Sequence, residues 1–241
     1  MPNFFRDYNY YLQSLKELKK QKGNDTSFSF GKRKPILNER FAESGIMSGH
    51  YFHQDLFVAR KIFEANPNKH VDIGSRTDGF VAHVASFRKI EVFDIREQHN
   101  KVKNIIFKKA DLTQLPDDLI NYCDSISSLH AIEHFGLGRY GDTIDYFGHL
   151  KAIENITKIL KAGGKFYFSV PIGEQRIEFN AHRVFSIKYL LGLFKSQFIL
   201  DSFSYVDDKG DFFEEATLDE ITINNNFNCH YGCGIFELTK I

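Results

Sequence analysis

From residue 69 to the end of the chain, short apolar runs alternate with helical patterns, and this alternation restricts the fold more than any other feature. Strands that alternate with helices form a mostly parallel sheet with helices on both of its faces. Ligands of such sheets bind outside the carboxyl ends of the strands, so the residues that follow each strand are the candidate site. The predicted strands are 69–74, 89–95, 104–112, 124–130, 164–173, 198–208 and 233–241, and the predicted helices between them are 78–87, 116–123, 146–161 and 186–196.

The residues before this pattern form a predicted N-terminal helical arm and lid. Aromatic and leucine side chains recur at helical spacing over 4–22, and a second helix is predicted over 51–66, where Asn-Pro stops it. The segment 23–50 between them is rich in Gly, Ser and Asn and lacks periodicity. We therefore expect two parts, the arm at 1–68 and an α/β domain at 69–241.

Composition excludes several classes of protein. Lys plus Arg and Asp plus Glu are both 31, so no net charge attracts a nucleic acid. No apolar run approaches the ~18 residues that span a bilayer, and the N-terminus lacks the apolar core of a signal peptide. The three cysteines, Cys123, Cys229 and Cys233, are an odd number, which favours free thiols in a reducing compartment. A cytoplasmic protein without a membrane span or a nucleic-acid partner is expected.

Acidic residues or glycines follow the first three predicted strands. "VDIGSRTDGF" (71–80) places Asp72, Gly74 and Gly79 on the first strand-to-helix turn, where glycine allows a ligand to approach the backbone closely. Asp94 ends the second strand, where a carboxylate can accept hydrogen bonds from a ribose diol, and Asp111 follows the third, placed for an adenine amino group. The turn is neither G-x-G-x-x-G nor a P-loop, so dinucleotides and triphosphates are disfavoured.

An acid at each of these strand ends, with a glycine turn after the first, resembles the class I S-adenosylmethionine-dependent methyltransferases over residues 69–241. "CDSISSLHAIEH" (123–134) is similar to the fourth strand and following turn of that family, and "ILKAGGKFYFSVP" (159–171) to its L-K-P-G-G turn and fifth strand, with Ala162 in place of proline. The resemblance implies a Rossmann-like methyltransferase sheet, mostly parallel with a C-terminal antiparallel strand, and S-adenosylmethionine as cofactor. It assigns these residues to the cofactor: Asp72, Gly74, Arg76, Gly79, Asp94, Ile95, Asp111, Leu112 and His130.

Four other stretches suggest a narrower family. "GHYFHQDLFVARKI", "DIGSRTDGFVAHV", "IEHFGLGRYGD" and "FNAHR" are similar to a little-characterised methyltransferase-like domain of unknown function that is linked to bacterial polysaccharide biosynthesis. This resemblance implies a carbohydrate-related acceptor. "GSRTDG" departs from the usual G-x-G-x-G and puts Arg76 and Asp78 near the methionine moiety. The pair either binds the carboxylate and amine of the cofactor or blocks it; if it blocks, the chain is a non-methylating enzyme or binding module for another nucleotide, such as a nucleotide sugar.

The motif "HAIEH" has two interpretations. His130, Glu133 and His134 have the H-x-x-E-H spacing of a group of zinc peptidases. However, "DSISSL" before the motif is a strand pattern, and "FGLGRYGD" after it holds three glycines and makes a poor helix, so no metal is expected. In the methyltransferase interpretation His134 is the candidate general base, assisted by Glu133 or His182, because the pKa of an imidazole lies near the working pH. The alternative is that Glu133 and His134 only cap the turn.

Two loops at the same sheet edge provide candidate acceptor-binding residues. Their mixture of polar and basic groups suits a small polyhydroxylated or phosphorylated molecule, although a solvated surface is the alternative for each residue. With the cofactor assignment, they predict methyl transfer to an O or N atom of a carbohydrate-related acceptor. The residues are Arg139, Tyr140 and Asp142 in the first loop, and Asn180 and Arg183 in the second.

Overall fold

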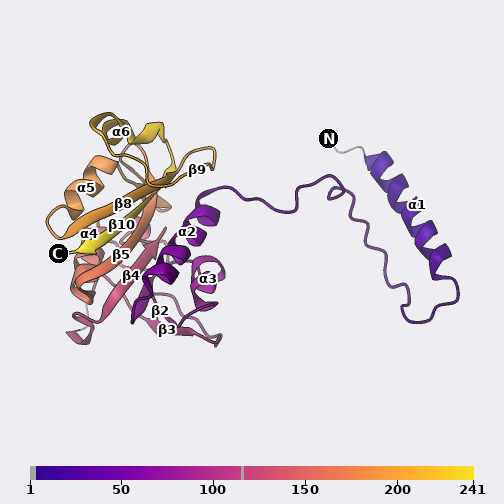
Figure 1. Ribbon diagram of the computed structural model, residues 1–241, viewed down its shortest axis with the longest axis horizontal. Helices are drawn as coiled ribbons and strands as arrows, with labels where there is room; N and C mark the ends of the chain where they lie inside the picture. Colours follow the sequence, from indigo (N-terminus) through magenta and orange to yellow (C-terminus); the bar gives the residue numbers. More distant parts are fainter. Residues whose placement is uncertain (1–3, 115–116) are drawn as a thin grey trace. The chain divides into compact units, whose positions relative to one another are not determined.

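The computed structural model consists of two units, Met1–Met47 and Ser48–Ile241 (Figure 1). It describes residues 4–114 and 117–241. The boundary precedes helix α2 (His50–Ala65), so this helix belongs to the same unit as the sheet, whereas the sequence places the expected boundary after residue 68.

The first unit contains helix α1 (Phe4–Lys22), whose bounds confirm the helix predicted over 4–22. Three lysines lie in its last turn, where positive charge interacts favourably with the helix dipole. The irregular segment that follows packs on the helix through Arg40, whose guanidinium lies 3.8 Å from the centroid of the Tyr10 ring. Among the residues that the structure describes, no helix combines the length and apolar character needed to cross a bilayer.

The second unit is built on one large sheet. Among the described residues, eight strands form it in the order β3-β2-β1-β4-β5-β10-β8-β9. The pairs from β3 to β5 are parallel, whereas β10 runs antiparallel to both β5 and β8. The predicted Rossmann-like methyltransferase sheet with a C-terminal antiparallel strand is confirmed. The strands are β1 (His70–Ile73), β2 (Ile90–Asp94), β3 (Ile105–Lys109), β4 (Cys123–Leu129), β5 (Leu160–Ile172), β8 (Phe198–Val206), β9 (Phe212–Phe213) and β10 (Gly232–Lys240).

Helices cover both faces of this sheet (Figure 1). Alternate residues of a strand point to opposite faces, so in β5 Phe166 and Phe168 join one core and Tyr167 joins the other. The core with the two phenylalanines is closed by α4 and α5, and the core with Tyr167 by α2 and the segment from η1 to α3. The further helical elements are η1 (Thr77–Val81), α3 (Ala82–Ala85), η2 (Asp117–Leu119), η3 (Ile132–His134), α4 (Gly148–Ile159), α5 (Ile187–Phe194), α6 (Glu220–Asn225) and η4 (Asn226–Asn228).

Two predicted helices differ from the structure, and one hairpin was not predicted. The predicted helix 78–87 is shorter and begins with the π-helical turn η1. The predicted helix 116–123 begins outside the described residues, and its described part is only the short 3₁₀ turn η2, because Asn121 takes a left-handed φ of 50°. A hairpin that the sequence did not predict consists of β6 (Arg176–Glu178) and β7 (His182–Val184) and lies at the carboxyl end of β5.

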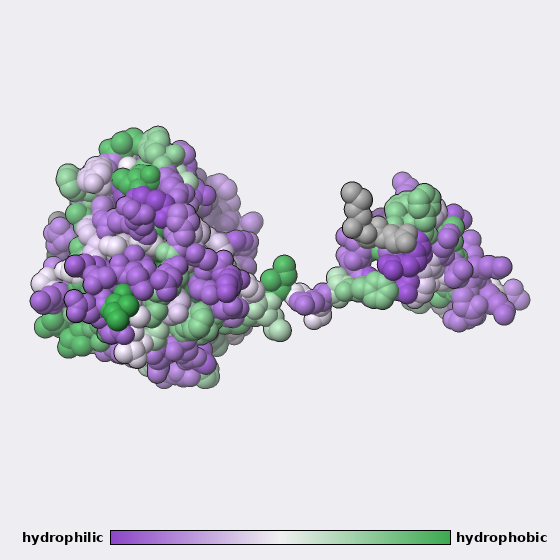
Figure 2. Space-filling view, turned by 90° about the horizontal axis from the view of Figure 1, so that it is seen from above, coloured by the Kyte–Doolittle hydropathy of each residue, from purple (hydrophilic) through white to green (hydrophobic). Residues whose placement is uncertain are grey.

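The surface of the sheet unit seen in Figure 2 is largely hydrophilic, with scattered hydrophobic side chains. Isolated apolar residues of this kind are normal for a folded protein. This face therefore gives no sign of a binding surface.

Candidate functional site

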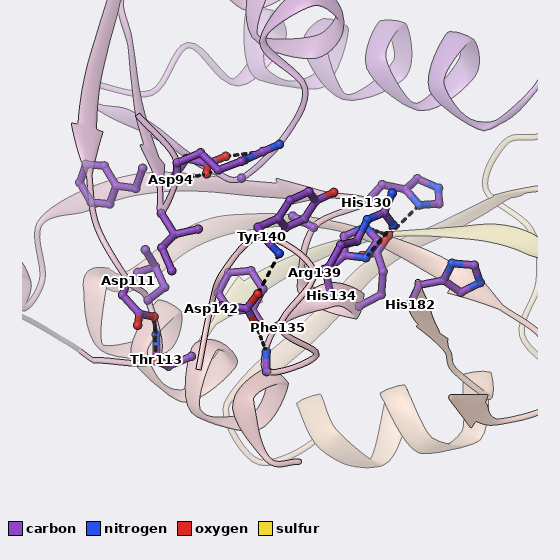
Figure 3. A pocket seen from close by; sticks show the side chains of 18 of the residues that line it. Asp94, Asp111, Thr113, His130, His134, Phe135, Arg139, Tyr140, Asp142 and His182 are labelled. Atoms are coloured by element: carbon purple, nitrogen blue, oxygen red, sulfur yellow. Dashed lines mark hydrogen bonds and ion pairs between the residues drawn. The ribbon is translucent and has the colours of Figure 1, made fainter. Parts of the chain in front are cut away.

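One pocket of about 510 Å³ lies at the carboxyl ends of the parallel strands. Its walls come from the turns after β1, β2, β3 and β4, and from the β6–β7 hairpin. Figure 3 shows Asp94 and Asp111 toward one end of the pocket and the histidines His130, His134 and His182 toward the other. The topology of the sheet thus brings two groups of predicted residues into one cavity.

Asp72 stabilises the turn after β1 through hydrogen bonds. Its carboxylate accepts hydrogen bonds from Ser75 N at 3.0 Å, Ser75 Oγ at 2.6 Å and Ser127 Oγ at 2.6 Å. Burial raises the pKa of Asp72 to about 7, and the side chain lies outside the pocket lining. Gly74 does line the pocket, with a φ of 70° that favours glycine. Asp72 therefore shapes the turn, and Gly74 presents its backbone to the cavity.

The second glycine of the turn faces a buried acid. A Cβ on Gly79 would lie 2.5 Å from Asp55 Oδ2, so the close approach at this position is to α2. Burial raises the pKa of Asp55 to about 6. Arg76 and Asp78 form an exposed ion pair at 2.8 Å, and only Arg76 lines the pocket. The "GSRTDG" departure thus puts an arginine at the cavity wall while its carboxylate partner remains outside.

Asp94, at the end of β2, is held by Arg96. Its carboxylate accepts hydrogen bonds from Arg96 N at 2.8 Å, Nε at 3.0 Å and Nη2 at 2.6 Å. The Arg96 guanidinium also lies 4.4 Å from the centroid of the Tyr140 ring. Asp94 therefore has a fixed orientation at the pocket wall, beside Ile95.

Asp111 and Leu112 line the same end of the pocket. Asp111 Oδ1 accepts hydrogen bonds from Thr113 N at 2.9 Å and Thr113 Oγ1 at 2.7 Å. Oδ2 accepts no hydrogen bond from the described residues, so it is available to a ligand donor. The carbonyl of Leu112 accepts from Asn155 Nδ2 at 2.9 Å, which ties this turn to α4.

At the other end, Glu133 lies between two histidines. Its Oε1 is 2.9 Å from His130 Nδ1 and 3.6 Å from His134 Nε2, and its side chain is 1% exposed. Burial acts against the charged forms, but the partners outweigh it: His130 holds the pKa of Glu133 below its ordinary value, and Cys233 and Glu133 raise the pKa of His130. The backbone of His130 has a φ of 49°, an uncommon conformation that occurs often at functional sites.

The hydrogen bonds of His134 fix its tautomer. Its Nδ1 lies 2.6 Å from the carbonyl oxygen of Ala181, and because a carbonyl only accepts, Nδ1 carries the hydrogen. Nε2 therefore carries the lone pair, next to Glu133. Burial lowers the pKa of His134, which keeps the imidazole neutral. A neutral histidine whose acceptor nitrogen lies beside a carboxylate is suited to accept a proton.

The loop after η3 is organised by Asp142. Its carboxylate accepts hydrogen bonds from the backbone N–H groups of Gly136, Gly138 and Tyr140, at 2.9, 3.1 and 3.1 Å. Tyr140 packs edge-on against the His134 ring, with centroids 5.6 Å apart. All but Gly138 of these residues line the pocket, as does Arg139.

The β6–β7 hairpin contributes His182 to the pocket. His182 Nε2 lies 3.1 Å from Glu178 Oε2, and its ring packs 4.9 Å from that of Tyr231. Arg183 lies outside the pocket, buried, where its guanidinium donates to the carbonyls of Glu133, Phe135 and Tyr146. Asn180 is exposed and also lies outside the lining. Arg183 thus supports the turn that carries Glu133.

Several pocket residues were missed by sequence reasoning. Arg96 has a short-range signal, since it follows Asp94 by two residues. Tyr51 and Tyr231 have none, because they reach the cavity from α2 and from the segment before β10.

Comparison with known structures supports the fold. The chain is similar to the [4+2]-cyclase SpnF, with a TM-score of 0.54 and 14% identity over 81% of this chain and 88% of that one. It is similar to a Burkholderia thailandensis 1,6-didemethyltoxoflavin N1-methyltransferase with bound S-adenosylhomocysteine, with a TM-score of 0.53 and 12% identity over 100% and 90%. It is also similar to the N-methyltransferase NodS from Bradyrhizobium japonicum, with a TM-score of 0.53 and 12% identity over 81% of this chain and 99% of that one. At these identities the likeness shows a methyltransferase fold.

Comparison with the curated proteins gives no match. Residues 71–229 match a family model described as "Caenorhabditis protein of unknown function, DUF268". The match covers well over half of the chain, including the glycine turn, both acidic strand ends and the histidine cluster. The chain therefore belongs to the DUF268 family.

Proposed function

We propose that this chain binds S-adenosylmethionine and transfers its methyl group to an oxygen or nitrogen atom of a small, carbohydrate-related acceptor. One observation carries the proposal. A single pocket holds carboxylates after β2 and β3 at one end, and at the other a neutral histidine backed by a buried carboxylate.

The residues present fit the cofactor. A volume of about 510 Å³ lies within the range of small-molecule sites. Asp94 would accept from the ribose hydroxyls, Asp111 Oδ2 from the adenine amino group, and Arg76 would pair with the methionine carboxylate. When bound, S-adenosylmethionine supplies an electrophilic methyl group on its sulfonium.

His134 is the proposed base. Its Nε2 takes the proton of the acceptor hydroxyl or amine as that atom becomes a nucleophile, and Glu133 stabilises the imidazolium that forms. The Ala181 carbonyl fixes the ring so that Nε2 remains the basic nitrogen. His182 and Arg139 would orient the acceptor, and holding it in line supplies much of the rate.

The carbohydrate nature of the acceptor is supported by the polar acceptor side of the pocket. Arg139, Tyr140 and His182 line it, with donors and an aromatic ring that suit a polyhydroxylated ring or its phosphate.

The three cysteines are free and buried, which agrees with the proposed cytoplasmic location.

A second candidate is a non-methylating enzyme or binding module that uses a nucleotide or nucleotide sugar in this pocket. It is favoured by the likeness to SpnF, a cyclase with the same fold, and by Arg76 at the cavity wall. Here Arg76 would pair with a phosphate.

Isothermal titration calorimetry separates the two candidates. S-adenosylmethionine and S-adenosylhomocysteine should bind the full chain with about one site, and UDP-glucose alone should not displace them. Absence of binding by both at millimolar concentration would contradict methyl transfer. Tight UDP-glucose binding by a chain that binds neither S-adenosylmethionine nor S-adenosylhomocysteine would support the second candidate instead.

A further inference from the structure

A cluster of ligand-type side chains combines His130 with His50 and Cys233, two residues to which the proposed methyl transfer assigns no role. His50, His130 and Cys233 each offer one nitrogen or sulfur atom, and these three atoms all lie within 4.8 Å of one another. His130 and Cys233 are buried and His50 is half-buried. Stacked rings join His50 to His130, with centroids 5.2 Å apart.

The sheet topology brings these residues together. Leu129 at the end of β4 pairs with Ser169 of β5, and on the other side of β5 Cys233 of β10 pairs with Pro171. The end of β4 and the start of β10 therefore flank the same end of β5. His50 begins α2, whose start is tied to the β8–β9 hairpin by the hydrogen bond from Gly49 N to Gly210 O at 3.0 Å.

The orientation of His130 points to a ligand. Its Nδ1 is bound by Glu133 Oε1, whereas Nε2 is buried and has no hydrogen-bond partner among the residues that the structure describes. The side chain is only 4% exposed. A buried polar atom without a partner is unfavourable. A histidine that binds a metal through one ring nitrogen typically donates a hydrogen bond from the other, often to a carboxylate. His130 Nδ1 and Glu133 have this arrangement.

We propose that His130 Nε2, a ring nitrogen of His50 and Cys233 Sγ bind one zinc ion. Two imidazoles and a thiolate are the donors that zinc prefers, and they disfavour Mg²⁺ and Ca²⁺. With bonds of about 2.0–2.3 Å, a tetrahedral zinc ion holds its ligand atoms about 3.3–3.8 Å apart. The three atoms here lie within 4.8 Å of one another, so side-chain movements of about 1 Å would bring them to these distances. On binding, Cys233 loses its thiol proton and His130 any proton that Nε2 carries, both to solvent, and a water or acceptor atom takes the fourth position.

This site differs from the zinc peptidase motif suggested by "HAIEH". His134 is not part of this group of ligand atoms, and Glu133 holds the ligand His130 instead of acting on a metal-bound water. The proposed ligands come from three distant segments, whereas the sequence alone led to the expectation of no metal. Without the ion, the Cys233 thiol donates weakly to Gln54 Oε1 at 3.5 Å.

The test is metal uptake by the purified full-length chain. The protein is stripped with a chelator, dialysed against Zn²⁺ and analysed by mass spectrometry for bound metal. We expect about one zinc ion per chain, and loss of uptake in Cys233→Ser and His50→Ala. Cys229→Ser and His53→Ala are matched controls, a buried thiol near β10 and a histidine one turn along α2, and should retain the ion.

Cobalt(II) provides a readout that requires no variant. Bound to the wild-type chain, it should show a thiolate-to-metal charge-transfer band in the near ultraviolet, which Cys233→Ser removes while its circular dichroism stays native. Failure of the wild-type chain to take up Zn²⁺ would overturn the site, as would unchanged uptake in a folded Cys233→Ser variant. If Cys233→Ser does not fold, absence of the wild-type cobalt band decides against it. S-adenosylhomocysteine binding is measured separately, so failure of either proposal is distinguishable.

Discussion

Replacement of Asp94 by alanine tests the cofactor end of the pocket directly. The Asp94 side chain is 11% exposed and accepts three hydrogen bonds, all from Arg96. A carboxylate has about four lone-pair positions. A ribose diol can therefore bind at the pocket side of Asp94 without displacing Arg96.

The expected loss of affinity follows from these contacts. A hydrogen bond to a charged acceptor contributes about 1.5–3 kcal/mol, so loss of the one bond that the remaining position can accept from the ribose costs about 1.5–3 kcal/mol. This corresponds to a dissociation constant raised by about 10–10²-fold. The alanine variant also loses the acceptor for Arg96 N, so its melting temperature should fall slightly.

Calorimetry with S-adenosylhomocysteine measures this effect. Asp94→Asn keeps one acceptor and should bind with an affinity between those of wild type and Asp94→Ala. Glu97→Ala removes an exposed acid of the same turn, paired with Lys109, and should bind like wild type. A folded Asp94→Ala variant whose dissociation constant lies within about threefold of the wild-type value would refute the ribose assignment.

Three further predictions concern the base and the first turn. His134→Gln should reduce methyl transfer by about 10²–10⁴-fold in a labelled-methyl assay, while its affinity for the cofactor stays near normal. Burial lowers the pKa of His134, and the base acts in its deprotonated form. The activity of the wild-type chain should therefore fall only as pH drops through this lowered pKa. Burial raises the pKa of Asp72 to about 7 from 3.8, so the folded state keeps a proton that the unfolded chain releases, and stability should decrease as pH rises across this window, by at most about 4 kcal/mol. Urea unfolding at about pH 5 and pH 8 should show this loss in wild type and little of it in Asp72→Asn; equal pH dependence in both would contradict the assignment. Gly79→Ala should cost about 1–3 kcal/mol, because the added Cβ would lie 2.5 Å from Asp55 Oδ2, and an unchanged melting temperature would argue against this packing.

The sheet was predictable from the sequence because its strands are buried. β1 is buried at all four positions, and β4 and the second half of β5 are nearly so. The second half of β5 is an almost continuous apolar run, as is typical of a strand covered on both faces, whereas β1 and β4 also bury polar side chains. β6 and β7 have three residues each, and β6 is mostly exposed, so neither gives such a run. The hairpin that carries His182 was missed for this reason.

Helix boundaries were predicted less well where the local pattern is ambiguous. In "ILKAGGKFYF" the two glycines suggest a turn between helix and strand, but α4 ends at Ile159 and β5 begins at Leu160. Gly163 lies inside the strand with a φ of 73°, and the pairing of β4 with β5 shifts register nearby. The glycines therefore mark an irregularity within β5.

Residue spacing pointed to the sheet edge at which the pocket lies, but it did not separate residues that line the pocket from those that support it. Asp72 pairs with Val92, two residues before Asp94. Asp72 is covered and accepts from Ser75 and Ser127, whereas Asp94 ends its strand and faces the cavity. The difference depends on serines in β4 and in the turn, which no motif includes. Arg183 is a similar case, since only its buried carbonyl partners reveal its supporting position.

The motif "HAIEH" alone does not identify the ligands of the proposed zinc site. A short motif includes only residues of one segment, and in this segment His130 and His134 bind different partners, Glu133 and the Ala181 carbonyl. The other two proposed zinc ligands, His50 on α2 and Cys233 on β10, lie far from His130 along the chain, one before it and one after it. They meet His130 because β10 inserts antiparallel beside β5, a pairing set by the packing of the whole sheet. If zinc binds, the strand order that makes this fold a methyltransferase sheet also creates its metal site.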